Sequence, residues 1–268
     1  MKAAIASTLL AYLPLAHAGV AYEMSSRDLT VVNAKPVLTR GYAQDDKLRE
    51  EEGVSWSAVS ITSAQALIVI DTSARTYRLM DQETLMRMGA RERASYEKNF
   101  AKRAEWPPNM RKMLDRIDTS TNEALAMEKQ PPDYRATDRH DVVAGFSCSI
   151  WEYYWKGSKE AEYCIARPAS IPGGAEWMVA LRAEGEFYTN ARRWLGDPAQ
   201  LLYASILPQA EAPSRLGGIL LMSRTFRQGK AVSESRVTAE GVESLNPDLF
   251  AVPKGYERQP AGPATPGR

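Results

Sequence analysis

The sequence predicts an α+β protein with a curved antiparallel sheet and helices packed on its concave face. Alternation of apolar and polar residues predicts strands in residues 20–52 and 218–240. Two blocks of helical period, on either side of a central cysteine hairpin, interrupt these strands. Because the helices come in blocks and do not alternate with single strands, the α+β class fits and a parallel α/β array does not. Helices on one face only require the sheet to curl around them.

The first 18 residues have the features of a secretory signal peptide. Lys2 precedes an apolar run, and the run ends in the small-x-small triplet Ala16-His17-Ala18. The run is too short to span a bilayer, and no later stretch is long and apolar enough to do so. We therefore predict an exported protein, periplasmic in a Gram-negative cell. Its one domain covers residues 19–257, and a tail rich in Pro, Gly and Ala, predicted to be disordered, covers 258–268.

The first group of strands ends in a helical insertion at about residues 81–130. Two runs, 65–70 and 76–80, predict a central strand pair, and the apolar spacing then changes from two to 3.6 after Asp81, a helix-capping residue. After the cysteine hairpin in the sequence, a long amphipathic helix is predicted by Trp177, Leu181 and the apolar positions that follow. Residues 208–217 are expected to be a loop, before two strands that turn at Gln228-Gly229.

The stretch 145–167 predicts a β-hairpin that carries both cysteines of the chain. A three-residue loop with Gly157 in the left-handed conformation would pair Tyr154 with Ser158. Counting outward in that register places Cys148 directly opposite Cys164, on one face of the sheet. We therefore predict a cross-strand disulfide, with two buried free thiols as the alternative.

Composition argues against several classes of function. The net charge of +1 gives no global field to attract nucleic acid. After signal cleavage His140 is the one histidine left, and with the cysteines paired no ligand set for zinc remains, so we predict no metal and no cofactor. No nucleophile elbow or phosphate-binding loop is present, and we predict a non-enzymatic protein. The carboxylate pair Glu152 and Glu162 leaves a hydrolase as a second alternative.

Two groups of residues are candidates for contacts with a ligand or a partner. The aromatic hairpin face and the long helix offer an apolar surface, either as the floor of a ligand groove or as plain core packing: Trp151, Tyr153, Tyr163, Ile165, Trp177 and Leu181. The helical insertion has a basic excess, which is either a solvated helix face or a contact for anionic lipid or an envelope protein: Arg91, Lys98, Lys102 and Arg103.

Several short motifs resemble an exported bacterial family, domain of unknown function 4412. They are Gly145-x-x-Cys148 with Cys164-x-Ala166, the segment Asp46–Arg49, the strand pair 67–80 and the closing 250–256. That family is similar in fold to the outer-membrane lipoprotein carriers (LolA-like), and the resemblance implies a half-barrel with helices in its mouth. It also implies a binding protein for an apolar ligand, a lipid or lipidated peptide, or else an envelope sensor or protein-interaction module. The block 81–129 departs from the family pattern.

Overall fold

The computed structural model describes residues 18–53, 57–102, 132–197 and 207–260, together with parts of 105–122. The first six strands are β1 (Ala18–Asp28), β2 (Val37–Gln44), β3 (Lys47–Glu52), β4 (Ala58–Thr62), β5 (Ala66–Asp71) and β6 (Thr76–Asp81). The other six are β7 (Asp133–Val143), β8 (Phe146–Trp155), β9 (Ser158–Ala166), β10 (Ile219–Arg227), β11 (Lys230–Ser244) and β12 (Glu257–Arg258). The α-helices are α1 (Gln82–Ala101), α3 (Gly174–Leu195) and α4 (Leu207–Leu216), and the 3₁₀ helices are η2 (Pro168–Ser170) and η4 (Pro247–Phe250).

The described strands form one open sheet in the order β12-β6-β5-β4-β3-β2-β1-β11-β10-β9-β8-β7. Neighbouring strands are antiparallel except for the short β12–β6 pair. The predicted α+β class and antiparallel sheet are therefore confirmed. Arg258 of β12 pairs with Tyr77 of β6, so the sheet includes residue 258, where the disordered tail was predicted to start.

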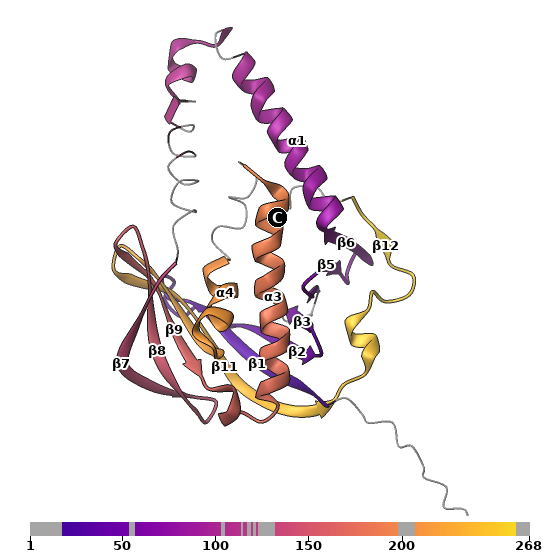
Figure 1. Cartoon of the computed structure of the whole chain (residues 1–268), viewed down its shortest axis with the longest axis vertical. Coiled ribbons are helices and arrows are strands. Elements are labelled where there is room, and N and C mark those ends of the chain that lie inside the picture. Colours follow the sequence, from indigo (N-terminus) through magenta and orange to yellow (C-terminus); the bar gives the residue numbers. More distant parts are fainter. Residues whose placement is uncertain are drawn as a thin grey trace, which may run out of the picture.

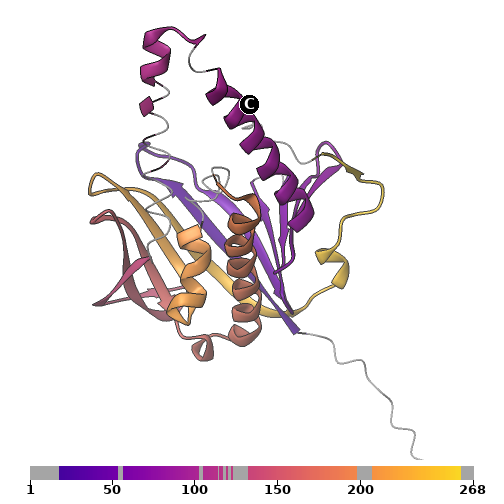
Figure 2. The ribbon, with the colours of Figure 1, turned by 45° about the horizontal axis from the view of Figure 1, so that its top comes forward.

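The helices lie against one face of the sheet, with α3 crossing β1–β4 and β10 and α4 resting on β9 and β10 (Figures 1 and 2). The apolar positions of α3 recur at helical spacing, and Trp177, Phe187 and Leu195 are fully buried. Residues 208–216, which the sequence predicted as a loop, belong to α4, and Ala212 of α4 is buried against the hairpin. Tertiary burial here outweighs the helix-breaking tendency of Pro213.

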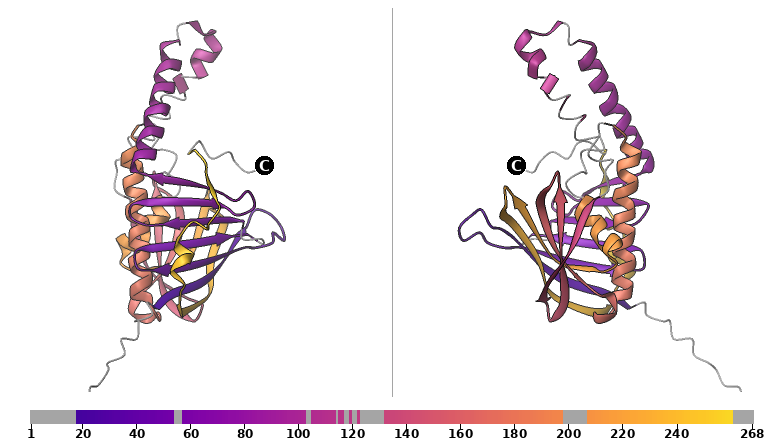
Figure 3. Two further views of the ribbon diagram at one scale, coloured as in Figure 1. Left: turned by 90° about the vertical axis from the view of Figure 1, so that its right-hand side faces the viewer. Right: turned by 60° about the vertical axis from the view of Figure 1, so that its left-hand side comes forward.

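Helix α1 begins where the change of period predicts. The side chain of Asp81 accepts a hydrogen bond of 2.9 Å from the backbone N–H of Thr84, a typical N-cap. The helix then leaves the body of the protein (Figure 3), and its described side chains after Gly89 are exposed except for Tyr96, which is half-buried. At Gly89, an added Cβ would lie 1.9 Å from the carbonyl oxygen of Leu195, so glycine permits α1 to cross the end of α3. No helix in the described part is long and apolar enough to cross a membrane.

The cysteine hairpin forms, but its register differs from the predicted one. The turn has two residues, Lys156 and Gly157, both with positive φ, so Trp155 pairs with Ser158. A bulge after Tyr153 shifts the ladder by one more residue, and Cys164 lies opposite Ile150. The two one-residue shifts add up to two, so both cysteines stay on the same face.

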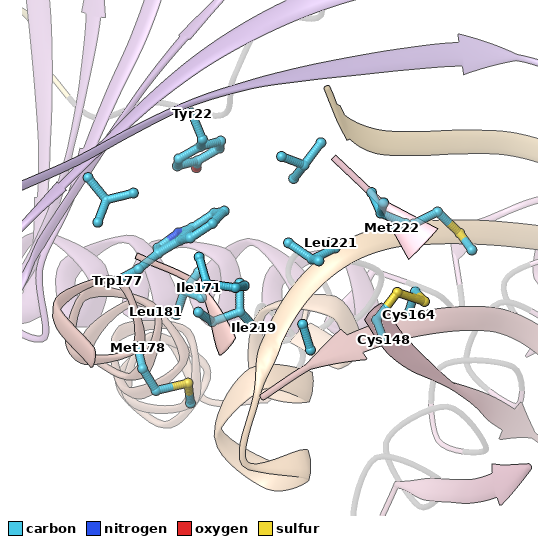
Figure 4. Close-up of a cluster of buried hydrophobic side chains, with 14 of the residues drawn as sticks. Tyr22, Cys148, Cys164, Ile171, Trp177, Met178, Leu181, Ile219, Leu221 and Met222 are labelled. Atoms are coloured by element: carbon cyan, nitrogen blue, oxygen red, sulfur yellow. A yellow bond between two sulfur atoms is a disulfide. The ribbon is translucent and has the colours of Figure 1, made fainter. Parts of the chain in front are cut away.

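The predicted disulfide is confirmed, with Cα atoms of Cys148 and Cys164 5.3 Å apart. It lies on the opposite face of the sheet from Tyr163 and Trp151, because neighbouring residues of a strand point to opposite faces. On that side β7 turns back toward β11, where Arg236 donates a hydrogen bond of 2.9 Å to the Val142 carbonyl and pairs with Asp141. Figure 4 shows the disulfide at one side of the largest core cluster, which reaches Tyr22 and Trp177 at the other.

Candidate functional site

A groove of about 350 Å³ lies over the first five strands. It is on the face that carries the helices, because its lining residue Glu50 is in the same cross-strand row as Tyr22, which packs on α3. The lining combines apolar, hydroxyl and acidic side chains: Met24, Ser26, Thr39, Glu50, Glu52, Ala58, Val59, Ser60 and Val69. No helix residue is among them, so the groove is built by the sheet beside α3.

Tyr22 joins the groove to the core. Its ring lies over Gly41, where an added Cβ would be 1.9 Å from the ring, so the site requires glycine. From there the Tyr22 hydroxyl donates a 2.8 Å hydrogen bond to Oε1 of Glu50. The other side of the tyrosine stacks on Trp177 with ring centroids 4.6 Å apart (Figure 4). Glu50 is thus positioned by an aromatic pair that links β1 to α3.

Glu50 of β3 lines the groove, and its charge acts on a second glutamate, Glu184 of α3. Protein atoms crowd both carboxyl groups, although each residue keeps partial exposure. Loss of hydration, with a smaller contribution from the charge of Glu50, raises the pKa of Glu184 to about 8. Burial also raises the pKa of Glu50, although the Tyr22 hydrogen bond favours its charged form. In the described part of the chain, no Arg or Lys forms an ion pair with either group.

The protonation of this pair matters for what the groove accepts. Because its pKa is near 8, Glu184 is mostly neutral at pH 7, so the pair has at most about one negative charge. The site therefore has less negative charge than its three glutamates, Glu50, Glu52 and Glu184, would have if all were ionised. An open, partly apolar groove with a few polar groups at its floor is typical of sites that bind small molecules or chain segments.

Replacement of Glu184 by Gln should remove a pH dependence of stability. Between the unfolded value of 4.5 and the folded value of about 8, the folded protein binds more protons at this site than the unfolded chain does. The free energy of unfolding of the natural protein should therefore fall as pH rises through this window, and the Glu184→Gln variant should show a flatter profile. Urea titrations across the window measure this.

The control is Glu186→Gln, which removes an exposed carboxylate two residues along the same helix. This variant should keep the slope of the natural protein. Equal slopes for all three proteins would contradict the assignment of a raised pKa to Glu184.

The sequence-predicted ligand residues are in the core. Tyr153, Tyr163 and Ile165 are buried, with Trp151 partly buried beside them, in the cluster that contains Ala212 of α4. Trp177 and Leu181 are on α3 and are buried in the largest core cluster. None of the six lines the groove, and their position agrees with the core-packing alternative. A role for them in ligand binding stays a prediction.

The other predicted candidates are on the surface or in ion pairs. Arg91, Lys98 and Lys102 are exposed on and just after α1, and Arg103 lies outside the described residues, so their contact with a partner stays a prediction. Glu152 and Glu162 are directly opposite each other, but Glu162 is held by three cations, Arg139, Lys159 and Arg224, at 2.8, 3.0 and 3.3 Å. Burial opposes ionisation of Glu162, and the hydrogen bonds from Arg139 and Lys159 outweigh it, so its pKa is lowered. This arrangement fits a structural ion-pair network.

Sequence reasoning missed Glu50 and Glu184, although both left a signal. Glu184 falls in the apolar stripe of α3, seven residues after Trp177. Glu50 takes an inward position in β3, two residues after the buried Leu48. A charged residue at a core-facing position is informative because burying it without a partner is costly.

No family model and no curated protein matches the chain, so the resemblance to domain of unknown function 4412 stays a prediction. An uncharacterized conserved protein from Thermus thermophilus is similar in structure, with a TM-score of 0.44, 9% identity, and coverage of 90% of this chain and 89% of that one. PNGF-II has a TM-score of 0.40 at 9% identity, and the match covers 91% of this chain and 31% of PNGF-II. The complex structure of Pseudomonas aeruginosa MucA/MucB has a TM-score of 0.35 at 7% identity, and the match covers 88% of this chain and 56% of that one. We base no functional conclusion on likenesses of this size.

Proposed function

We propose that this protein is an exported, non-enzymatic binding module whose open sheet acts as a half-barrel. The groove over strands β1–β5, beside α3, would receive an apolar ligand, a lipid or lipidated peptide. The observation that supports this most is the groove itself, whose volume of about 350 Å³ falls within the range of ligand sites in proteins. The disulfide supports export, because such bonds persist in oxidising compartments such as the periplasm.

The chemistry of the lining indicates the kind of ligand. Met24, Ala58 and Val69 provide apolar contact, and methionine adapts to chains of different shape. Glu50 and Glu52 are acceptors at one side of the groove, so the polar end of the ligand should have hydrogen-bond donors. An acyl chain with an amide or ammonium group satisfies both conditions.

Native mass spectrometry of protein purified from its source under gentle conditions tests this function. We expect an adduct with the mass of a lipid or lipidated peptide. The variant Ser60→Phe, which places a ring in the groove, should lose the adduct, whereas Ser244→Phe, on an exposed strand end, should keep it. Equal melting temperatures would show that both variants fold. An adduct retained in Ser60→Phe, or absent from every preparation, would contradict the proposal.

A protein-interaction module is a second proposal, supported by α1. This helix leaves the body of the protein and is exposed around most of its surface after Gly89 (Figure 3). In the described part of the chain the outer part of α1 is mostly exposed, and Arg91 and Lys98 on it, with Lys102 just after it, are available to an acidic partner. The same mass spectra would then show a protein adduct in place of a small one.

A further inference from the structure

An apolar patch is exposed at the tip of the β1–β2 hairpin. Of the eleven exposed large apolar side chains in the described part of the chain, five are in residues 29–38: Leu29, Val31, Val32, Val37 and Leu38. We call residues 29–38 the β1–β2 tip. Val32 is 87% exposed and Val31 54%, which is unusual for neighbouring valines in a protein with a well-packed core. The hairpin extends beyond the adjoining strands (Figure 3), and its large apolar side chains are exposed.

The β1–β2 tip is ordered by hydrogen bonds at its base. The Leu29 N–H bonds the Val232 carbonyl at 2.9 Å, which ties the tip to β11. Asp28 accepts bonds of 2.8 and 2.6 Å from the backbone and hydroxyl of Thr30, and these bonds lower the pKa of the Asp28 carboxyl. The apolar side chains are therefore presented on a formed turn, which reduces the entropy cost of binding.

Basic residues lie at the same end of the sheet. The strand registers place the β10–β11 turn and the β8–β9 turn beside the β1–β2 tip, and Figure 2 shows the three hairpins ending on one side. These two turns and the tip have no carboxylate in residues 29–38, 155–158 or 227–230, and they have four cations: Lys35, Lys156, Arg227 and Lys230. A convex apolar tip with a cationic surround matches an anionic bilayer surface better than a protein groove.

We propose that the β1–β2 tip inserts into the headgroup region of an anionic membrane. The four cations contact lipid phosphates while Val31 and Val32 enter the acyl boundary. The groove starts next to the β1–β2 tip, because its lining residue Ser26 pairs with Val37, so a docked protein would hold the groove opening near the lipid. This goes beyond the proposed ligand binding and does not depend on it.

Vesicle flotation tests the proposal. The natural protein should float with vesicles of phosphatidylethanolamine and phosphatidylglycerol, and the double variant Val31→Ser/Val32→Ser should bind about tenfold less or weaker still. Val142→Ser is the matched control, because Val142 is 59% exposed on β7 at the opposite end of the sheet, and it should bind as the natural protein does. Arg227→Gln/Lys230→Gln should lose about fivefold per cation on these vesicles.

A spectroscopic reading separates insertion from simple adsorption. Both native cysteines are in the disulfide, so Val32→Cys provides a single site for an environment-sensitive dye. Its emission should rise and shift to the blue when vesicles are added. No flotation of the natural protein, or unchanged flotation of Val31→Ser/Val32→Ser, would overturn the proposal. Binding of a protein partner through the β1–β2 tip without any binding to vesicles would overturn it too. The native mass spectrum of Val31→Ser/Val32→Ser reports the groove ligand separately.

Discussion

Truncation of Trp177 to Ala should reduce the free energy of unfolding by about 3–5 kcal/mol, the range for loss of a large buried aromatic. Trp177 is 2% exposed and connects α3 to the sheet through its stack on Tyr22. Its removal leaves a cavity in the largest core cluster and frees Tyr22, so Glu50 loses its positioned donor. Urea unfolding followed by circular dichroism measures the loss.

The variant Trp177→Phe separates packing from polarity. The indole Nε1 is buried without a hydrogen-bond partner in the described structure, so phenylalanine removes a polar group that contributes nothing and keeps a ring against Tyr22. This variant should lose less than half as much stability as Trp177→Ala. If the Ala variant unfolds within about 1 kcal/mol of the natural protein, the link between α3 and the sheet through Trp177 is wrong.

Removal of the disulfide should cost about 3 kcal/mol in the chain-entropy model, for a loop whose ends are 16 residues apart. The double variant Cys148→Ala/Cys164→Ala, and the natural protein under reductant, should unfold at similarly lowered urea concentrations. β7 and its return contact with β11 should loosen first, because Cys148 lies next to β7 and opposite Asp141.

Adding reductant to the double variant is the control and should change nothing. Thiol counting on the denatured natural protein should give two thiols after reduction and none before. Two thiols before reduction would contradict the disulfide. Such a result would also weaken the inference of export.

The sequence predicted the cysteine pairing although it gave the wrong register. Turn residues predict a short loop but do not distinguish two loop residues from three when Lys156 adopts a positive φ, which is uncommon for lysine. A bulge leaves no reliable sequence signal, since it depends on how neighbouring strands twist together. The pairing survived because the two shifts together preserve which face each residue occupies.

The candidate site was harder to predict. Gly41 and Tyr22 are 19 residues apart in the chain, and Trp177 is 155 residues beyond Tyr22, so no local pattern places the three in one stack. The aromatic residues of the hairpin were correctly expected on one face. Whether that face was covered depended on α4, a helix in a segment whose proline indicated a loop.

By itself the sequence determined the class of fold, the helix start at Asp81 and the disulfide, because these follow from periodicity, capping and face parity within short stretches of chain. Only the tertiary structure decided which apolar residues are core and where a groove remains. It also decided that Glu50 and Glu184 interact electrostatically and that the valines of the β1–β2 tip stay exposed. The physical reason is that burial, and the pKa shifts and surface patches that follow from it, depend on neighbours brought together by the sheet order and the helix crossings.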